Sequence, residues 1–471
     1  MHGFQSLTPV QRRVLWGLAA GVVLVSGLLG WSVWTALQSH PILSPLPTPA
    51  FQDTALPSLS PSPTLKPSIT SPTLPASTLT SPFDVAQAGL IAAQVSDARG
   101  LLPRWSTPLT LVDAHTMAVA LYQHYKVQPP LPLSMQTALK ALRLWPEDDT
   151  QMQVDPVAQA QTLAALYVSN TAELYLRRDW TGPRDLLEWQ IAYGYARATS
   201  DQYGQLPQLI ANADSLDRRL ALTATGDGDA LFSLWLYAGV TPGSAQAQAL
   251  TDSITQAIIP RWKTAAPLWN DLTRLTLDLG NVFVTDLYTR GGTTAIDAAV
   301  LRPPRSTEQL LHVDRYLEDD APELLTPLQP PLGKGWVLTH TDTLGEAMLR
   351  LTVAEWSNTT ARVETALTWG GDLLQIWAGP DGADAIVWQI GWDSNRDAVH
   401  FYGQLMDILP HPLLPGLILD TIPATTLPPG HWWSGRQGAV FLYRSGKRVW
   451  LIWGTDVVAV ETIGATLKST L

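Results

Sequence analysis

The sequence predicts an α+β protein with a single N-terminal transmembrane helix and a disordered linker ahead of its folded parts. An uncharged apolar stretch runs from Val14 to Leu37, and a segment rich in Pro, Ser and Thr follows it to Pro82. Apolar residues then recur at helical spacing, and beyond Gly333 they alternate as in strands. The predicted parts are a cytoplasmic tail (1–13), a transmembrane helix (14–37), a linker (38–82), a mainly helical part (83–332) and an α+β part (333–471).

Composition excludes several classes of function. The 471 residues carry a net charge of −11 and no cysteine. A chain of this length can build two or three structural units around a sizeable core. An acidic chain without a basic run is a poor partner for nucleic acid, so we expect none. Without cysteine, the protein has no disulfide, no thiolate nucleophile and no Cys-type metal site.

The stretch Val14–Leu37 predicts contact with a membrane. Its uncharged length of about 24 residues suffices for a helix to cross a hydrocarbon core of about 30 Å. Arg12 and Arg13 precede it, and the next Lys or Arg is Lys66, so the positive-inside rule places the N-terminus in the cytoplasm. The alternative is a cleaved signal peptide, but the apolar run is long and no A-x-A cleavage site follows it. We therefore expect a single-pass protein of the cytoplasmic membrane, with the bulk of the chain extracytoplasmic.

The segment 38–82 reads as a spacer. Repeats such as LSPLPTP and SPSPTLKPS cannot bury enough apolar surface to offset their ordering entropy, and their prolines favour extended polyproline II. The same composition would suit an O-glycosylated stalk or a ligand for proline-binding domains. Nothing in the segment separates these alternatives.

Helices dominate the part that begins near Phe83. Asp113 is a candidate N-cap for a helix over residues 113–125, and Met135, Leu139 and Leu142 follow at helical spacing after Ser134. A hairpin is expected from the strand-like runs 164–168 and 173–177 around Ser169-Asn170. Further helices are expected over residues 185–198, 215–223, 229–238, 245–263 and 266–289.

Two strand–strand–helix units are expected after Gly333. In the first, strands over 373–377 and 385–392 flank a turn at 379–382, and a helix covers 394–409. In the second, strands over 438–443 and 448–454 precede a helix over 457–467. Trp-rich strands such as VWLIW indicate a packed sheet, with an aromatic ligand platform as the alternative.

The helix expected from Pro183 to Ala198 carries the spacing of a zinc motif without its chemistry. Trp189 and Tyr193 stand at i and i+4, with Gln190 directly after Trp189, as in H-E-x-x-H. In that motif two imidazoles bind zinc and a glutamate activates water. An indole only donates, a tyrosine is protonated at neutral pH and a glutamine takes no proton.

The surrounding residues resemble a family of bacterial, gluzincin-like zinc metallopeptidases. Thr171, Leu174 and Tyr175 match the strands before the zinc helix, and Asp227-Gly228-Asp229-Ala230 resembles the family's Glu-Gly-Asp-Ala. Residues 302–317, RPPRSTEQLLHVDRYL, resemble its Pro-Pro-x-Ser-Thr-Glu-Gln-x-x-His-Pro block. The resemblance spans roughly residues 99–402, and its later matches are Leu344-Gly345-Glu346, Trp369-Gly370-Gly371-Asp372, Trp388 and Trp392-Asp393.

The resemblance implies a mainly helical, metallopeptidase-like part whose zinc site has degenerated. Trp189 stands for the first His ligand, Gln190 for the catalytic Glu, Tyr193 for the second His and Asp227 for the third ligand. We therefore expect no metal, no other cofactor and no catalytic residue. Glu308 and His312 would line the former cleft, which would bind an unknown protein or peptide as part of a binding or scaffolding protein of the cell envelope.

Two other hypotheses remain open. The chain could be an active hydrolase with a non-zinc acid–base constellation around Asp227 or Glu308; two acids with a histidine in one pocket would favour this. It could also be a structural or sensory envelope protein unrelated to peptidases, in which case 302–317 should be an exposed loop. In that reading WQIAY is an ordinary buried helix face. If Trp189 fills the space of a lost ligand in the core, Trp189→Ala should cost a few kcal/mol.

Overall fold

The computed structural model describes residues 84–127, 129–146, 153–263, 267–357, 368–420, 422 and 427–468. Contacts group residues Ala76–Leu471 into one compact unit. The predicted cytoplasmic tail, transmembrane helix and linker lie outside the described residues. The predicted location in the cytoplasmic membrane depends on these residues and stays a prediction.

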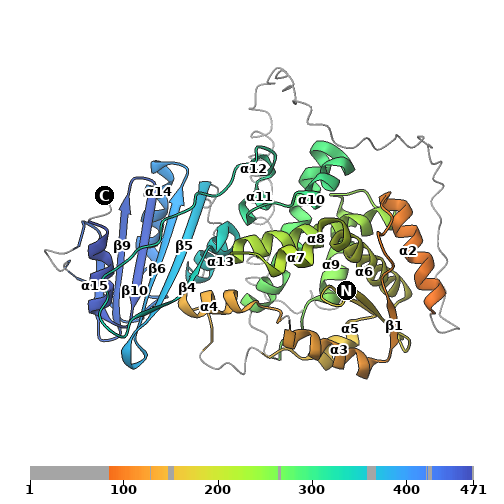
Figure 1. The fold of residues 1–471 in the computed structure, drawn as a ribbon, viewed down its shortest axis with the longest axis horizontal. Helices are drawn as coiled ribbons and strands as arrows, with labels where there is room; N and C mark the ends of the chain where they lie inside the picture. The colour runs from red at the N-terminus through yellow and green to blue at the C-terminus, as the bar shows by residue number, and fades with distance from the viewer. Residues whose placement is uncertain are drawn as a thin grey trace, which may run out of the picture. The chain divides into compact units, whose positions relative to one another are not determined.

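The predicted fold class, which included a membrane-spanning helix, is wrong for this structure. None of its described helices is long and apolar enough to cross a bilayer. The long helix α8 (Leu216–Tyr237) shows why, because charged residues such as Asp217, Arg218 and Asp227 recur along it. The described fold is a mixed one, with helices first and a large sheet after them (Figure 1).

The helical part is built around three long helices. Helix α6 (Arg184–Gly204) packs against α8, and α8 packs against α10 (Pro267–Leu301). Helices α2 (Val85–Arg99), α7 (Leu206–Ala211) and α9 (Ala245–Ile258) complete this group (Figure 1). Their shared core contains large apolar side chains such as Trp235, Phe232 and Phe283.

Glycines let α8 and α10 approach each other closely. A Cβ on Gly228 would lie 2.6 Å from the carbonyl oxygen of Gly280, and one on Gly280 would lie 2.4 Å from that of Ala224. The backbones therefore touch with no side chain between them. The predicted break between residues 223 and 229 is wrong, because these glycines serve helix packing and do not end a helix.

The predicted hairpin before α6 is confirmed. Strands β2 (Ala165–Val168) and β3 (Glu173–Arg177) pair antiparallel, and β1 (Leu109–Val112) adds to β3 in parallel. Asp113 accepts a hydrogen bond from the backbone N–H of Thr116 at 2.8 Å at the start of the next helix, as its predicted N-cap role requires. The nearby helices are α3 (Ala114–Val127), α4 (Leu133–Ala141) and α5 (Pro156–Thr162).

Both strand–strand–helix units are confirmed, and they share one seven-stranded sheet of order β4-β5-β6-β10-β9-β8-β7. The predicted hairpins are β5–β6 and β9–β10, and the units join through the antiparallel pair β6–β10. The strands are β4 (Val337–Asp342), β5 (Trp369–Ala378), β6 (Asp384–Trp392), β7 (Ile418–Asp420), β8 (His431–Gly435), β9 (Gly438–Ser445) and β10 (Arg448–Gly454).

The two units place their helices on opposite faces of the sheet. Helix α14 (Asn395–Ile408) shares a core with Trp388 and Trp453, whereas α15 (Val457–Thr466) shares a core with Trp377 and Trp450. The Trp-rich strands are therefore packed on both sides. The α14 face continues into helix α13 (Gly345–Ser357) and into residues of α4, α8 and α10.

Candidate functional site

Trp189, the first predicted zinc position, is only partly buried and packs against the helical core. The indole covers apolar neighbours and is not enclosed by them. The loss expected for Trp189→Ala is therefore smaller than for a fully buried tryptophan.

Gln190 ties α6 to the start of β2. Its side chain is 2% exposed, and Oε1 accepts hydrogen bonds from the backbone N–H groups of Ala164 (2.8 Å) and Ala165 (3.2 Å). Its Nε2 donates to the carbonyl oxygen of Thr162 at 3.1 Å. An amide serves these three groups because it both donates and accepts, which an ionised glutamate does not. Gln190 thus holds a strand in place, at the position predicted for a catalytic glutamate.

Tyr193 and Asp227, the other two predicted positions, do meet. The Tyr193 hydroxyl donates to Asp227 Oδ1 at 3.3 Å. Arg197, one turn further along α6, places Nη1 3.6 Å from the same Asp227 oxygen and Nη2 3.3 Å from Asp201 Oδ1. Burial raises the pKa of Asp227, and the Arg197 charge opposes this effect. The cationic partner of Asp227, the predicted third ligand, is therefore the Arg197 guanidinium.

Arg197 is a residue that the motif comparison missed. It is 7% exposed, and a Cβ on Gly226 would lie 1.5 Å from its Nη1. The guanidinium occupies the space left by this glycine. A signal was available in the sequence, because Trp189, Tyr193 and Arg197 follow one another at i, i+4 and i+8 on one helix face.

Asp229, two residues further along α8, is also paired with a buried arginine. Arg99 of α2 donates to Asp229 Oδ1 at 2.8 Å and lies 2.6 Å from Asp297 of α10. The Ser200 hydroxyl donates to the other Asp229 oxygen. Both carboxylates of the Gly-Asp-Gly-Asp stretch therefore have cationic partners from the protein itself.

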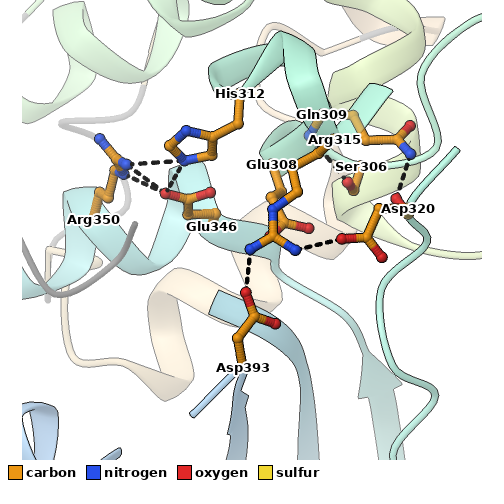
Figure 2. A network of polar contacts seen from close by, with 9 residues as sticks. All are labelled: Ser306, Glu308, Gln309, His312, Arg315, Asp320, Glu346, Arg350 and Asp393. Carbon is orange, nitrogen blue, oxygen red and sulfur yellow. Dashed lines mark hydrogen bonds and ion pairs between the residues drawn. The ribbon is translucent and has the colours of Figure 1, made fainter. Parts of the chain in front are cut away.

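The second group of predicted site residues is Glu308, on the short helix α11 (Thr307–Leu311), and His312, which lies between α11 and α12 (Val313–Leu317). Residues 306–310 are buried, so the segment 302–317 is not an exposed loop. Figure 2 shows its polar contacts. His312 Nε2 lies 3.0 Å from Glu346 Oε1, and Arg350 Nε donates to the same oxygen at 2.8 Å. Arg315 bridges Asp320 and Asp393.

Glu308 sits among these charges without a hydrogen bond to Oε1 in the described part of the chain. It is 2% exposed, and burial raises its pKa to about 8 although Arg315 Nε lies 3.9 Å away. Glu346, which is fully buried, adds to the increase. Glu308 therefore gives up its proton at a higher pH than an ordinary glutamate does.

Two further buried carboxylates, Asp217 of α8 and Asp372 of β5, lie beside Gly345 at the start of α13. Asp217 Oδ1 accepts hydrogen bonds from the Thr307 backbone N–H (2.8 Å) and hydroxyl (2.6 Å), and burial raises its pKa to about 7. Asp372 accepts from the N–H groups of Gly345 and Trp388, both at 2.8 Å, and burial raises its pKa to about 6. The later blocks of the resemblance therefore meet at this junction.

The two groups of predicted residues form separate networks of contacts. Gln190 and Asp227 bond within the helical part, whereas Glu308 contacts Arg315 of α12 and His312 contacts Glu346 of α13. Among the residues that the structure describes, no three His, Asp or Glu side chains lie together as a metal site.

Comparison with known proteins gives one match. A family described as a domain of unknown function (DUF8575) matches residues 336–464, which run from β4 to α15. No curated protein matches the chain, and no solved structure does. The match covers the sheet and its helices, so the resemblance of the helical part to metallopeptidases stays a prediction.

Proposed function

We propose that this chain is a pseudo-peptidase, a non-catalytic protein that uses a peptidase-like helical part for binding or scaffolding. The observation that carries the proposal is the buried Arg197 guanidinium beside Asp227. A fixed positive charge at the third-ligand position repels a divalent cation and supplies the counter-charge that the carboxylate needs.

The other positions support the same conclusion. The Gln190 amide is bound to three backbone groups of residues 162–165 and has no free lone pair aimed at a substrate. Burial raises the pKa of Tyr193 well above its ordinary value, so its hydroxyl stays protonated and is a poor metal ligand. The positions of the zinc motif serve to hold α6 to its neighbours.

Zinc binding by the full-length chain tests this proposal. We expect no stoichiometric zinc by elemental mass spectrometry and no change of melting temperature when zinc is added. The double variant W189H/Y193H restores both imidazoles but keeps Arg197, so we expect it to remain without zinc. One zinc per wild-type chain would overturn the proposal, and zinc binding by the double variant would show that Arg197 does not exclude the metal.

A second candidate is a hydrolase that uses Glu308, Glu346 and His312. It is favoured by a pair of His312 and Glu346 in contact, with a second acid, Glu308, close enough for the Glu346 charge to raise its pKa (Figure 2). Against it, both carboxyl groups are almost fully buried. Hydrolysis of chromogenic esters and peptides by the wild type, lost in Glu308→Gln, would establish this candidate in place of the pseudo-peptidase.

A further inference from the structure

A groove lies on the α15 face of the large sheet, away from the residues discussed above. Its volume is about 980 Å³, within the range of ligand sites. Strands β6 and β10 form its floor, α15 forms one wall, and the strap, residues 326–331, forms the other. Exposed apolar side chains, among them Pro327, Pro331 and Val458, line it.

Two polar atoms at the floor of this groove have no hydrogen-bond partner in the described structure. They are the acceptor Oε1 of Gln389 and the donor Nε1 of Trp450. Gln389 is 3% exposed and Trp450 6% exposed. The two residues are direct cross-strand partners in the β6–β10 ladder, so their side chains lie side by side on one face. Two neighbouring residues at the floor of the groove thus carry one unpaired acceptor and one unpaired donor.

The adjacent strand shows what such an amide can hold. Gln375 of β5 lies on the same face and binds the strap at Leu328: its Oε1 accepts from the Leu328 N–H at 2.8 Å, and its Nε2 donates to the Leu328 carbonyl at 3.2 Å. One glutamine of this sheet therefore already binds both backbone polar groups of one residue that lies outside any helix or strand. Gln389 presents the same group on the neighbouring strand, with the Trp450 N–H as an additional donor.

We propose that this groove binds an extended, uncharged peptide. One N–H of the peptide donates to Gln389 Oε1, a carbonyl accepts from Trp450 Nε1, and apolar side chains lie against Pro331 and Val458. Recognition of a charged group is disfavoured, because Arg448 at the groove is already paired with Glu323 and the lining also contains Glu461. The site is independent of the zinc-motif positions and of the function proposed for them.

Fluorine NMR of the full-length chain labelled with 5-fluorotryptophan tests the proposal. The probe is a pool of acetyl- and amide-capped pentapeptides made of Leu, Pro, Thr and Gln. Trp450→Phe identifies the resonance of Trp450 among those of the twenty tryptophans. We expect a saturable shift of that resonance and an affinity at least about tenfold lower in Gln389→Leu. Gln404→Leu on α14, which packs against the other face, should bind as the wild type does.

Three results would overturn the proposal: no shift of Trp450 at about 5 mM peptide, equal affinity in Gln389→Leu, or equal affinity for analogues whose amides are replaced by esters. The last result would mean that no peptide N–H donates to Gln389, because an ester keeps the carbonyl acceptor and lacks only the donor. Unfolding is not a confounding factor, because Gln389→Leu removes an unpaired acceptor and should leave the melting temperature unchanged or higher. Gln375→Leu, by contrast, breaks two hydrogen bonds to the strap and should lower the melting temperature.

Discussion

At the scale of single residues, the helical centre depends on pairs in which one side chain fills the space that another lacks. Arg197 lies where Gly226 has no Cβ, and it neutralises Asp227 and Asp201. Gln190 occupies a position where only a group that donates and accepts satisfies the backbone of residues 162–165. Such residues are sensitive to substitution although none of them is large and apolar.

Gly226→Ala should lower the free energy of unfolding by about 3 kcal/mol, because the new methyl group displaces Arg197 from two buried carboxylates. Urea denaturation followed by tryptophan fluorescence measures the change. Gly89→Ala in α2 is the matched control, since a Cβ there meets nothing within 4 Å. It should be neutral or stabilising by up to about 1 kcal/mol through helix propensity. Equal effects of the two variants would contradict the packing argument.

Gln190→Leu should cost about 3 kcal/mol, because it leaves the buried N–H of Ala164 and the partly buried carbonyl of Thr162 without partners. In Gln190→Glu the protonated acid still donates an O–H at low pH, so its cost there should be smaller than that of Gln190→Leu. At neutral pH the carboxyl group ionises and loses this donor, so the cost should be larger. Chemical denaturation at both pH values checks this order. A Gln190→Glu protein as stable as the wild type would mean that the amide donor contributes nothing.

At the scale of elements, the sequence predicted what depends on local pattern. Asp113 caps its helix, and both C-terminal hairpins form around the expected turns. The sequence pattern gave a wrong prediction at Gly226 and Gly228, where we expected a break between two helices and the structure has one continuous helix, α8. Their function becomes visible only once α10 and Arg197 are in place, and both come from distant parts of the chain. Strands β4, β7 and β8 were also missed; β7 is only three residues long.

The junction around α11 should make stability depend on pH. Folded Glu308 and Asp217 have pKa values of about 8 and about 7, against ordinary values of 4.5 and 3.8. The folded state therefore holds protons that the unfolded state releases between about pH 4 and pH 8. The free energy of unfolding should fall as the pH rises through this window.

Urea midpoints between about pH 6 and pH 8 measure this dependence. Glu308→Gln, a neutral replacement, should flatten the slope and raise stability at the upper end. Glu318→Gln, at an exposed glutamate of the same region, should leave the slope unchanged. An unaltered slope in Glu308→Gln would mean that Glu308 is ionised in the folded protein throughout.

At the scale of the whole molecule, one apolar core crosses the boundary between helices and sheet. The indole N–H groups of Trp453 and Trp356 each donate at 3.1 Å to a carbonyl at the end of α4, Ala141 and Leu142 respectively. The antiparallel pairing of β6 with β10 and these two hydrogen bonds join residues that are far apart in sequence. Patterns within short windows carry no information on such pairings, so the sequence predicted the two units but not their shared sheet.

The C-terminal part, residues 333–471, should therefore not fold stably alone. Without α4, α8 and α10, part of the apolar face around Trp388 and Trp453 would be exposed to water. We expect the isolated fragment to bind a hydrophobic dye and to lack dispersed methyl resonances, whereas the full chain unfolds in one transition. A monomeric fragment with sharp, dispersed spectra would show that the sheet is a self-sufficient domain.

Arg99 has a consequence for how far the chain can be shortened from its amino end. Arg99 lies on the first described helix. Its guanidinium forms ion pairs with Asp229 and Asp297 and lies over the ring of Phe232. A protease that removes residues ahead of Asp84 leaves this cation in place. A cut beyond Arg99 would leave the buried Asp229 without its counter-ion, so proteolysis should stop at a resistant fragment that still begins with α2.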